Sequence, residues 1–221
     1  HFLSITDLAP KDIEGIIVRA NHIREQKPAD NPLSGKSVVL LFEKPSLRTR
    51  SSFELAIHQL GGHCLYLGPS EVSLGARETV ADVTKVLSRY VDCIVARVFS
   101  HNTLTEMATN ATVPVINALS DWEHPCQTLA DLQTIRQYKG TCRGFKISYV
   151  GDGNNVARSL CLGASSVGYN FAIATPTEYR LDKSTLELAK GIAANQQSTV
   201  ECFTSPQKAV RGSDVVYTDV W

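Results

Sequence analysis

Residues 36–60 read KSVVLLFEKPSLRTRSSFELAIHQL, which indicates a buried strand that turns directly into a helix. The strand is the apolar run from Val38 to Phe42, and it is continuous rather than alternating, as expected for a parallel strand covered on both faces. Pro45 and Ser46 interrupt this run, and Ser46 is a favourable N-cap for the helix that follows. This strand–helix pair predicts an α/β protein.

The same alternation of strands and helices continues along the rest of the chain. Further strands are expected at residues 64–67, 93–98, 113–117, 145–150, 171–174 and 215–218. Helices are expected within residues 5–27, at residues 78–89 and 125–137, directly after residues 151–155, and at residues 186–194. Strands that alternate with helices form parallel sheets with helices on both faces. The predicted fold class is therefore α/β with two doubly wound parallel-sheet domains.

The long helix at residues 125–137 and the break that follows it indicate a domain boundary. We expect a first domain at residues 1–139 and a second, incomplete domain at residues 140–221. The last predicted strand leads to Asp219, near the final residue of the chain. An α/β domain rarely stops at such a strand end, so we expect the chain to be a fragment of a longer protein.

Composition argues against several classes of protein. The 22 Lys and Arg residues balance the 22 Asp and Glu residues, which disfavours a nucleic-acid binder that works through bulk positive charge. The longest apolar run falls far short of the ~20 residues of a membrane helix. The six cysteines form no C-x-x-C pair and no zinc-like spacing with histidine. We therefore expect free thiols in a reducing cytoplasm, and no metal.

Polar residues follow the first predicted strand at the place where open α/β sheets bind their ligands. The helix there begins with Ser46, Leu47, Arg48, Thr49 and Arg50. A helix N-terminus offers free backbone N–H groups and the positive end of the helix dipole, and arginine adds a planar fork that fits phosphate oxygens. This cluster predicts a phosphate site. The alternative is an ordinary serine cap beside solvated arginines.

Two further strand ends carry candidate residues. Arg97 lies within an apolar run, so it needs a partner or a ligand unless it reaches solvent from an edge strand. His124 stands at the start of a helix, where it can hydrogen-bond a carbonyl oxygen, and Gln127 can hold an amide one turn later. A histidine in this position, taken alone, is more often structural than catalytic, and Cys126 is expected to serve packing.

The second half of the chain offers groups suited to an amino acid. The turn at Gly151–Asn155 shares two glycines with a dinucleotide turn, but the third glycine and the strand-end acid of that motif are absent. Asn154 and Asn155 instead provide amides for an α-carboxylate and an ammonium group, or simply cap a helix. Asp219 can hold a cationic substrate, or it is a turn residue.

Taken together and in this order, several motifs resemble the carbamoyltransferase superfamily and its ornithine branch. They are Phe42-Glu43-Lys44-Pro45-Ser46-Leu47-Arg48-Thr49-Arg50, Leu74-Gly75 with Glu78, Asn117-Ala118-Leu119-Ser120-Asp121, His124-Pro125-Cys126-Gln127, Gly151-Asp152-Gly153-Asn154-Asn155 and Thr218-Asp219-Val220-Trp221. The S-x-R-T-R and H-P-x-Q motifs are typical of the superfamily, whereas the G-D-G-N-N turn and the T-D-x-W end point to the ornithine branch. The resemblance covers essentially all 221 residues.

This resemblance implies transfer of the carbamoyl group from carbamoyl phosphate to the δ-amine of L-ornithine. The products would be L-citrulline and phosphate, in arginine biosynthesis, with no cofactor. It also implies a cytoplasmic homotrimer, a carbamoyl-phosphate domain followed by an ornithine domain, and a loop near Ser73 that reaches a neighbour's site. Three alternatives stay open: a carbamoyltransferase for another amine such as putrescine or N-acylated ornithine, a non-catalytic phosphate or amino-acid binding module, and a nucleotide-binding oxidoreductase.

The resemblance also assigns roles to individual residues. Carbamoyl phosphate would be bound by Ser46, Leu47 (through its backbone N–H), Arg48, Thr49, Arg97, His124 and Gln127. Catalysis would fall to Arg48, His124 and Gln127, and ornithine would be held by Asn155 and Asp219. The chain departs from the family at Leu47, where threonine is common, and at Ser73, where a longer Gln or His is common. The family's Ser-Met-Gly loop and His-Cys-Leu-Pro motif do not occur in these residues.

Overall fold

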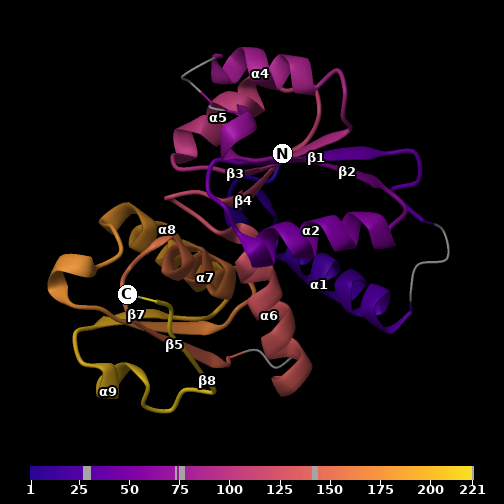
Figure 1. The fold of residues 1–221 in the computed structure, drawn as a ribbon. Helices are drawn as coiled ribbons and strands as arrows, with labels where there is room; N and C mark the ends of the chain where they lie inside the picture. Colours follow the sequence, from indigo (N-terminus) through magenta and orange to yellow (C-terminus); the bar gives the residue numbers. More distant parts are fainter. Residues whose placement is uncertain (27–30, 73, 75–77, 141–143, 221) are drawn as a thin grey trace. The chain divides into compact units, whose positions relative to one another are not determined.

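The computed structural model describes the chain apart from residues 27–30, 73, 75–77, 141–143 and 221 (Figure 1). The described residues form two compact units. The first contains residues 1–3 and 22–122, and the second contains residues 4–21 and 123–221. The second unit therefore takes an N-terminal segment, and it starts earlier in the chain than the boundary at residue 140 that the sequence predicts.

The first unit is built around a parallel sheet with the strand order β2-β1-β3-β4. These strands are β1 (Ser37–Phe42), β2 (His63–Leu67), β3 (Cys93–Arg97) and β4 (Val115–Leu119). The helices are α2 (Leu47–Gln59), α3 (Pro69–Val72), α4 (Val80–Leu87) and α5 (His101–Asn110). Helices cover both faces, with α2 on one face and α4 and α5 on the other (Figure 1), because each parallel connection needs a crossover.

Strand β1 lies inside this sheet and is buried on both faces. Val39 and Leu41 point to one face, where they pack in a cluster that includes Leu104 of α5. Leu40 points to the other face and packs in a cluster with Ile57 of α2. Each fully buried aliphatic side chain contributes about 1.5–3 kcal/mol relative to an exposed one. Burial on both faces therefore explains the continuous apolar run in the sequence.

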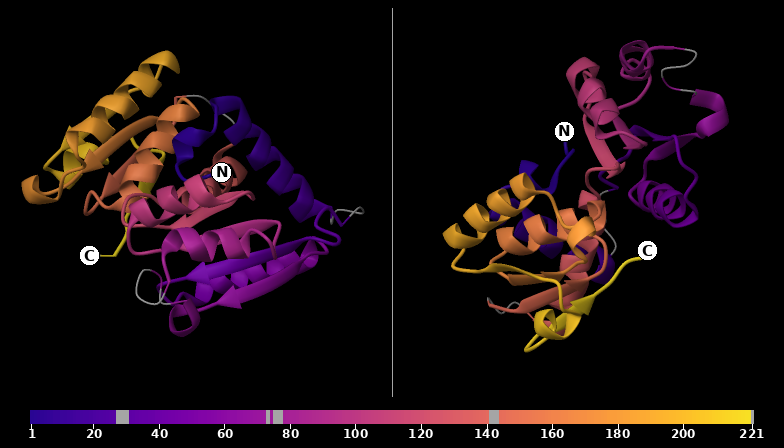
Figure 2. Two further views of the ribbon diagram at one scale, coloured as in Figure 1. Left: turned by 90° about the horizontal axis from the view of Figure 1, so that it is seen from above. Right: turned by 90° about the vertical axis from the view of Figure 1, so that its left-hand side faces the viewer.

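The second unit holds another parallel sheet, with the strand order β7-β6-β5-β8. Its strands are β5 (Lys146–Val150), β6 (Asn170–Ala174), β7 (Val200–Phe203) and β8 (Val215–Tyr217). Its helical elements are η1 (Ile5–Asp7), α6 (Pro125–Lys139), α7 (Asn155–Ser166), η2 (Thr177–Tyr179), α8 (Lys183–Asn195) and α9 (Pro206–Ala209). Helix α1 (Pro10–Glu25) begins in this unit as well. Helices α7 and α8 cover one face and α9 the other (Figure 2), so the predicted doubly wound α/β architecture is confirmed.

In both sheets, the strand that comes first in the chain has later strands on both of its sides. In the first sheet, β2 lies on one side of β1 and β3 on the other; in the second sheet, β6 and β8 flank β5 in the same way. The loops that leave such neighbouring strands diverge to opposite faces and open a crevice at the carboxyl ends of the strands. The crevice positions are therefore the β1/β3 and β5/β8 strand ends.

The sequence misses some elements and places others well. The structure confirms the helix that begins after Ser46, whose side chain accepts a hydrogen bond from the backbone N–H of Thr49, and the helix that begins at Pro125. Helix α5 was not predicted, because its only buried residues are Leu104 and Met107 and its apolar pattern is weak. Strand β7 and helix α9 were also missed, because both are four residues long and largely exposed.

Helices α6 and α7 approach each other closely at Gly163. A Cβ atom at this position would lie 2.4 Å from Cγ2 of Thr128 and 3.4 Å from Cγ1 of Ile5. Thr128 is buried on α6, and α7 is buried along almost its whole length. The absence of a side chain at Gly163 therefore permits the contact that holds α6, and the residues at its N-terminus, against α7.

We expect Gly163→Ala to lower the free energy of unfolding by about 1–3 kcal/mol, the usual range for an overpacked core. This loss would occur although alanine favours a helix interior by ~1 kcal/mol over glycine. Thr128→Ser removes Cγ2, so the double variant should regain most of the loss. Urea unfolding of the four proteins completes this cycle. A Gly163→Ala variant as stable as the wild type would contradict the close contact.

Candidate active site

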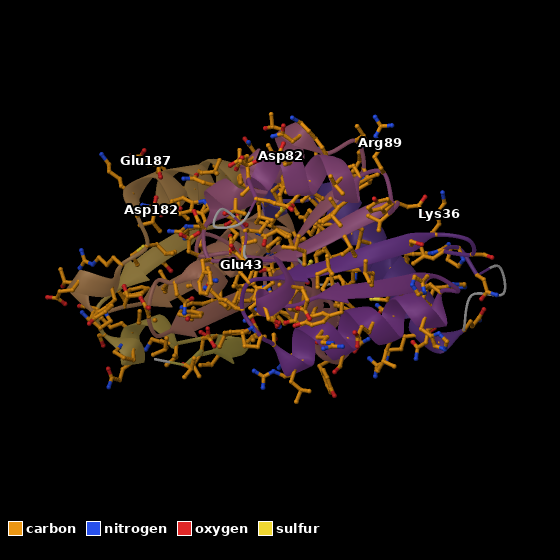
Figure 3. The ribbon with its side chains drawn as sticks, turned by 45° about the horizontal axis from the view of Figure 1, so that its top comes forward. Lys36, Glu43, Asp82, Arg89, Asp182 and Glu187 are labelled. Atoms are coloured by element: carbon orange, nitrogen blue, oxygen red, sulfur yellow. The ribbon has the colours of Figure 1, made fainter. Side chains whose placement is uncertain are left out.

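The carboxyl ends of β1 and β3 are joined by hydrogen bonds in the first unit. The backbone N–H of Glu43 donates to the carbonyl oxygen of Arg97 at 2.8 Å. The side chain of Glu43, labelled in Figure 3, accepts from the backbone N–H of Phe99 at 2.7 Å. These contacts hold the loop after β1 against the loop after β3, at the first of the two crevice positions.

Three predicted phosphate ligands contact one another at this position. The Ser46 hydroxyl donates to Oγ1 of Thr49 at 2.9 Å and accepts the Thr49 backbone N–H at 3.4 Å. Nη1 of Arg97 donates to the same Thr49 Oγ1 at 3.2 Å. Leu47 is the first residue of α2, and its side chain is 83 % exposed, so its position leaves the backbone N–H available at the helix N-terminus.

The charges around Arg97 favour an anion. Burial, and then the like charge of Arg48, lower the pKa of Arg97. Within the described part of the chain, neither arginine forms an ion pair, and the buried Nε of Arg97 has no hydrogen-bond partner. An unsatisfied buried donor costs about 1–3 kcal/mol. A phosphate oxygen would satisfy this donor and neutralise the repulsion between the two guanidinium groups.

In the second unit, a buried carboxylate network supports the N-terminus of α6. The backbone N–H of His124 donates to Oγ of Ser159 at 2.9 Å. That hydroxyl donates in turn to Oε2 of Glu123 at 3.0 Å, and the backbone N–H of Ile5 donates to the same oxygen at 3.1 Å. Glu123 is only 2 % exposed. The network fixes the backbone at His124, although neither Glu123 nor Ser159 was predicted from the sequence.

Gln127 contacts an acidic residue one turn further along α6. Its Nε2 donates to Oδ1 of Asp131 at 2.9 Å, whereas the buried Oδ2 of Asp131 has no hydrogen-bond partner among the described residues. Burial raises the pKa of Asp131 to about 6; the hydrogen bond from Gln127 and the nearby Tyr217 hydroxyl lower it, and the charge of Asp219 raises it. Burial also raises the pKa of the Cys126 thiol to about 12, which favours the packing role expected for this cysteine.

The β5/β8 strand ends bring together two of the groups expected to meet an amino acid. Oδ1 of Asn154 caps α7 by accepting the backbone N–H groups of Val156 and Ala157, each at 3.0 Å. Its Nδ2 donates to Oδ2 of Asp219 at 3.3 Å. Asn155 is the first residue of α7, and its Oδ1 also lies 3.0 Å from the backbone N–H of Val156. Both asparagines thus serve the helix N-terminus, and Asn154 also contacts Asp219.

The structure explains the glycines of the G-D-G-N-N turn without a nucleotide. A Cβ at Gly153 would lie 2.5 Å from the backbone nitrogen of Leu181 and 2.6 Å from the carbonyl oxygen of Tyr179. The backbone N–H of Gly153 donates to that oxygen at 2.7 Å. Glycine is therefore needed where the backbone of residues 179–181 crosses the turn, and this removes the main argument for a dinucleotide site.

The predicted site residues divide between the two units. Ser46, Leu47, Arg48, Thr49 and Arg97 belong to the first unit, and His124, Gln127, Asn155 and Asp219 to the second. Asp131 is the clearest residue that the sequence reasoning missed. Its spacing of four residues from Gln127 on an expected helix was the available signal. The motif residues Ser73, Gly75 and Trp221 lie outside the described residues.

The described parts of the chain lack two kinds of feature. No group of three or more His, Cys, Asp or Glu side chains is placed there to hold a metal ion. None of the helices in these parts combines the length and the apolar character needed to cross a bilayer.

Comparison with protein families agrees with this geometry. Residues 1–137 match the profile of the aspartate/ornithine carbamoyltransferase carbamoyl-P binding domain. Residues 143–221 match that of the aspartate/ornithine carbamoyltransferase Asp/Orn binding domain. The chain belongs to the aspartate/ornithine carbamoyltransferase family. The family resemblance expected from the sequence is thus confirmed.

Individual members of the family match along the whole chain. The chain is 45 % identical over 223 residues to ornithine carbamoyltransferase of Anoxybacillus flavithermus, covering all of this chain and 71 % of that protein. The structure of ornithine carbamoyltransferase from Pyrococcus furiosus matches with a TM-score of 0.96 and 44 % identity, over all of this chain and 71 % of that one. A mitochondrial ornithine carbamoyltransferase from Coccidioides immitis matches with a TM-score of 0.95 and 37 % identity, over 100 % and 74 %.

We expect Asp131 to make stability depend on pH between its ordinary pKa of 3.8 and its folded value of about 6. The folded protein holds this proton more tightly than the unfolded chain does. The contribution of Asp131 to stability is therefore complete below pH 3.8 and is lost as the pH rises through about 6. At pH 7, Asp131→Asn should unfold with a free energy up to about 3 kcal/mol higher than that of the wild type.

Urea unfolding of both proteins between pH 4 and pH 8 measures this difference. Asp182 titrates in the opposite sense: burial opposes ionisation, but hydrogen bonds from Ser184, Thr185 and Arg158 outweigh it and lower its pKa. The stability that Asp182 contributes is lost only as the pH falls below its ordinary pKa of 3.8. This contribution is the same in the wild type and in Asp131→Asn. Equal stabilities of wild type and variant at every pH would contradict the burial of the Asp131 charge.

Proposed function

We propose that the protein transfers the carbamoyl group of carbamoyl phosphate to the δ-amine of L-ornithine, giving L-citrulline and phosphate. The observation that carries this proposal is the anion cradle at the N-terminus of α2. There Arg97 contacts Thr49 beside Arg48, with no carboxylate partner among the described residues. Its support is the family membership and the ornithine carbamoyltransferases that match the whole chain.

Carbamoyl phosphate is the proposed ligand of the first unit. Ser46, Thr49, Arg97 and the backbone N–H of Leu47 would bind its phosphate, since together they offer hydroxyls, a guanidinium fork and a helix N-terminus. The exposed side chain of Leu47 supports a contact through the backbone, which a threonine in its place would share. Arg97 and the helix N-terminus would then stabilise the departing phosphate.

The chemical step needs stabilisation of charge rather than a strong base. The neutral δ-amine attacks the carbamoyl carbon, and negative charge grows on the carbonyl oxygen before the C–O bond to phosphate breaks. Arg48, Thr49 and His124 are proposed to stabilise this oxygen, and Gln127 to orient the carbamoyl group. The hydrogen bond from the backbone of His124 to Ser159 supports a fixed position for the histidine. Phosphate is already a good leaving group, so no cofactor enters the proposal.

Asn155 and Asp219 are proposed to hold ornithine. Asp219 provides a negative charge for the α-ammonium group, and Asn155 provides a side-chain amide at the start of α7. The hydrogen bond from Asn154 to Asp219 supports this assignment, because it fixes the carboxylate beside the same turn. Putrescine lacks the α-carboxylate, and N-acylated ornithine lacks the free α-ammonium group, so neither would use both contacts.

The proposed assembly is a homotrimer in the cytoplasm. Cys64, Cys93, Cys161 and Cys202 carry free thiols, which suits a reducing compartment. The loop near Ser73, expected to reach a neighbouring subunit, lies outside the described residues, so its role stays a prediction. One relative, from Pyrococcus furiosus, is named an anabolic ornithine carbamoyltransferase, and we propose the same biosynthetic direction for this protein. Light scattering of the purified protein tests the trimer.

Arg48→Ala should lower kcat/KM for carbamoyl phosphate by about 10²–10³-fold, the usual loss when one donor to a developing oxyanion is removed. Arg89→Ala is the matched control, because Arg89 is an exposed arginine of the same unit that follows α4 (Figure 3). Its rate should equal that of the wild type. Near-normal turnover by Arg48→Ala would refute the role assigned to Arg48.

Citrulline formation by the protein in its natural full length tests the function directly. Carbamoyl phosphate should be supplied with ornithine and, in parallel, with putrescine, N-acetylornithine and aspartate. Turnover confined to ornithine is the expected result. Turnover with another amine would keep the carbamoyl-phosphate assignment and overturn the ornithine assignment, whereas no turnover with any amine would favour a binding module.

A further inference from the structure

The contact between Gln127 and Asp131 carries an inference that rests on the function proposed above. Both residues lie on α6, one turn apart, with Nε2 of Gln127 donating to Oδ1 of Asp131 at 2.9 Å. Gln127 is a proposed ligand of the carbamoyl group, and Asp131 is its hydrogen-bonded neighbour on the same helix. Both side chains are partly buried, so the pair is shielded from the solvent competition that weakens exposed pairs.

An ionised carboxylate determines which way the Gln127 amide turns. A carboxylate only accepts hydrogen bonds, whereas an amide has one accepting end and one donating end. The amide must therefore direct its NH2 group toward Asp131 and its carbonyl oxygen away from it. Without this contact the amide could rotate by half a turn, at little cost, and present an NH2 group where it now presents an oxygen.

Tyr217 of the second sheet lies near Asp131. Burial, and then the charge of Asp131, raise the pKa of the Tyr217 hydroxyl, and the ring of Tyr217 stacks on that of Tyr149 with centroids 5.8 Å apart. Tyr149 is 0 % exposed. This stack holds Tyr217 in place, so the acid lies against β8 as well as on its own helix. A surface pair formed only by helical spacing would lack this second support.

We propose that Asp131 is a positioning residue that orients the Gln127 amide, so that its oxygen accepts a hydrogen bond from the NH2 of the carbamoyl group. This contact makes the site select carbamoyl phosphate over acyl phosphates of the same shape. Acetyl phosphate is the matched probe, because a methyl group replaces the NH2 group and the phosphate is unchanged. A site built to bond an N–H group discriminates against an analogue that lacks it.

The test compares substrate preference in five proteins: the wild type, Asp131→Leu, Asp131→Asn, Gln127→Ala, and the double variant Gln127→Ala/Asp131→Leu. For each, kcat/KM for carbamoyl phosphate and the inhibition constant of acetyl phosphate are measured at pH 8, where the Asp131 carboxyl is ionised. Leucine matches the shape of the acid without an acceptor, and asparagine keeps an acceptor oxygen. Circular dichroism confirms folding, and Asp131→Ala replaces Asp131→Leu in the cycle if the leucine variant does not fold.

Asp131→Leu should lower kcat/KM for carbamoyl phosphate about 10-fold, the effect of roughly one hydrogen bond. The inhibition constant of acetyl phosphate should stay within about 2-fold, because no bond to its methyl group is lost. Asp131→Asn should keep most of the preference. Gln133→Ala is the matched control: Gln133 lies on the same helix and donates to Asn21 at 2.9 Å, and its loss should leave both constants unchanged.

The double variant separates positioning from a merely structural role. If Asp131 acts through Gln127, Asp131→Leu should cause no further loss in the Gln127→Ala background. Additive losses, or equal weakening of carbamoyl and acetyl phosphate, would overturn the proposal. This inference alone is overturned if the wild type turns over normally and Asp131→Leu shows the same preference for carbamoyl phosphate over acetyl phosphate. A wild type that forms no citrulline would overturn the proposed function, and this inference with it.

Discussion

Parallel connection of the strands is the constraint on which the rest of this structure depends. In a parallel sheet every strand must be followed by a crossover, so the strand carboxyl ends and the helix N-termini gather at one edge. Strand order reverses beside β1 and β5, and the loops there diverge. Ser46 and Arg97 follow or end the strands at the first position, and Asn154 and Asp219 follow the strands at the second. The topology alone therefore places these polar groups at the carboxyl-end edge of each sheet, whether or not a ligand is bound.

The two positions hold charges of opposite sign. At the first, Arg97 is half-buried beside Arg48, and its one described side-chain contact is the neutral hydroxyl of Thr49. At the second, Asp131 is buried near the like charge of Asp219. Glu123 shows the contrast, because two donors satisfy one oxygen of this deeply buried carboxylate. These charges destabilise the protein without ligands, and an anion at the first position and a cation at the second would neutralise them. Such an arrangement is expected of a site that is organised before its ligand binds.

Local signals explain what the sequence predicts well. Three signals depend only on neighbouring residues, and the structure confirms all of them. They are the N-cap at Ser46, Pro125 in the first turn of α6, and the apolar run of β1. Helix α5 and strand β7 bury few side chains, so their patterns are weak and their presence follows only from the need to connect or extend a sheet. The sequence could not show why residue 153 is a glycine, because the backbone that crosses Gly153 lies 26–28 residues further along the chain. A nucleotide turn was therefore a possible interpretation.

Nonlocal contacts also explain why Asp131 was missed. Its spacing from Gln127 is local, but its neighbour Tyr217 belongs to a strand far along the chain, and only the folded protein shows that the acid is largely buried. A leucine at this position would fill a similar volume without the desolvation penalty of a carboxylate. Packing therefore gives no reason for an acid at this point of α6. Its hydrogen bond with Gln127 does: with an acceptor beside it, the Gln127 amide has one orientation rather than two, and a carbamoyl group requires that distinction.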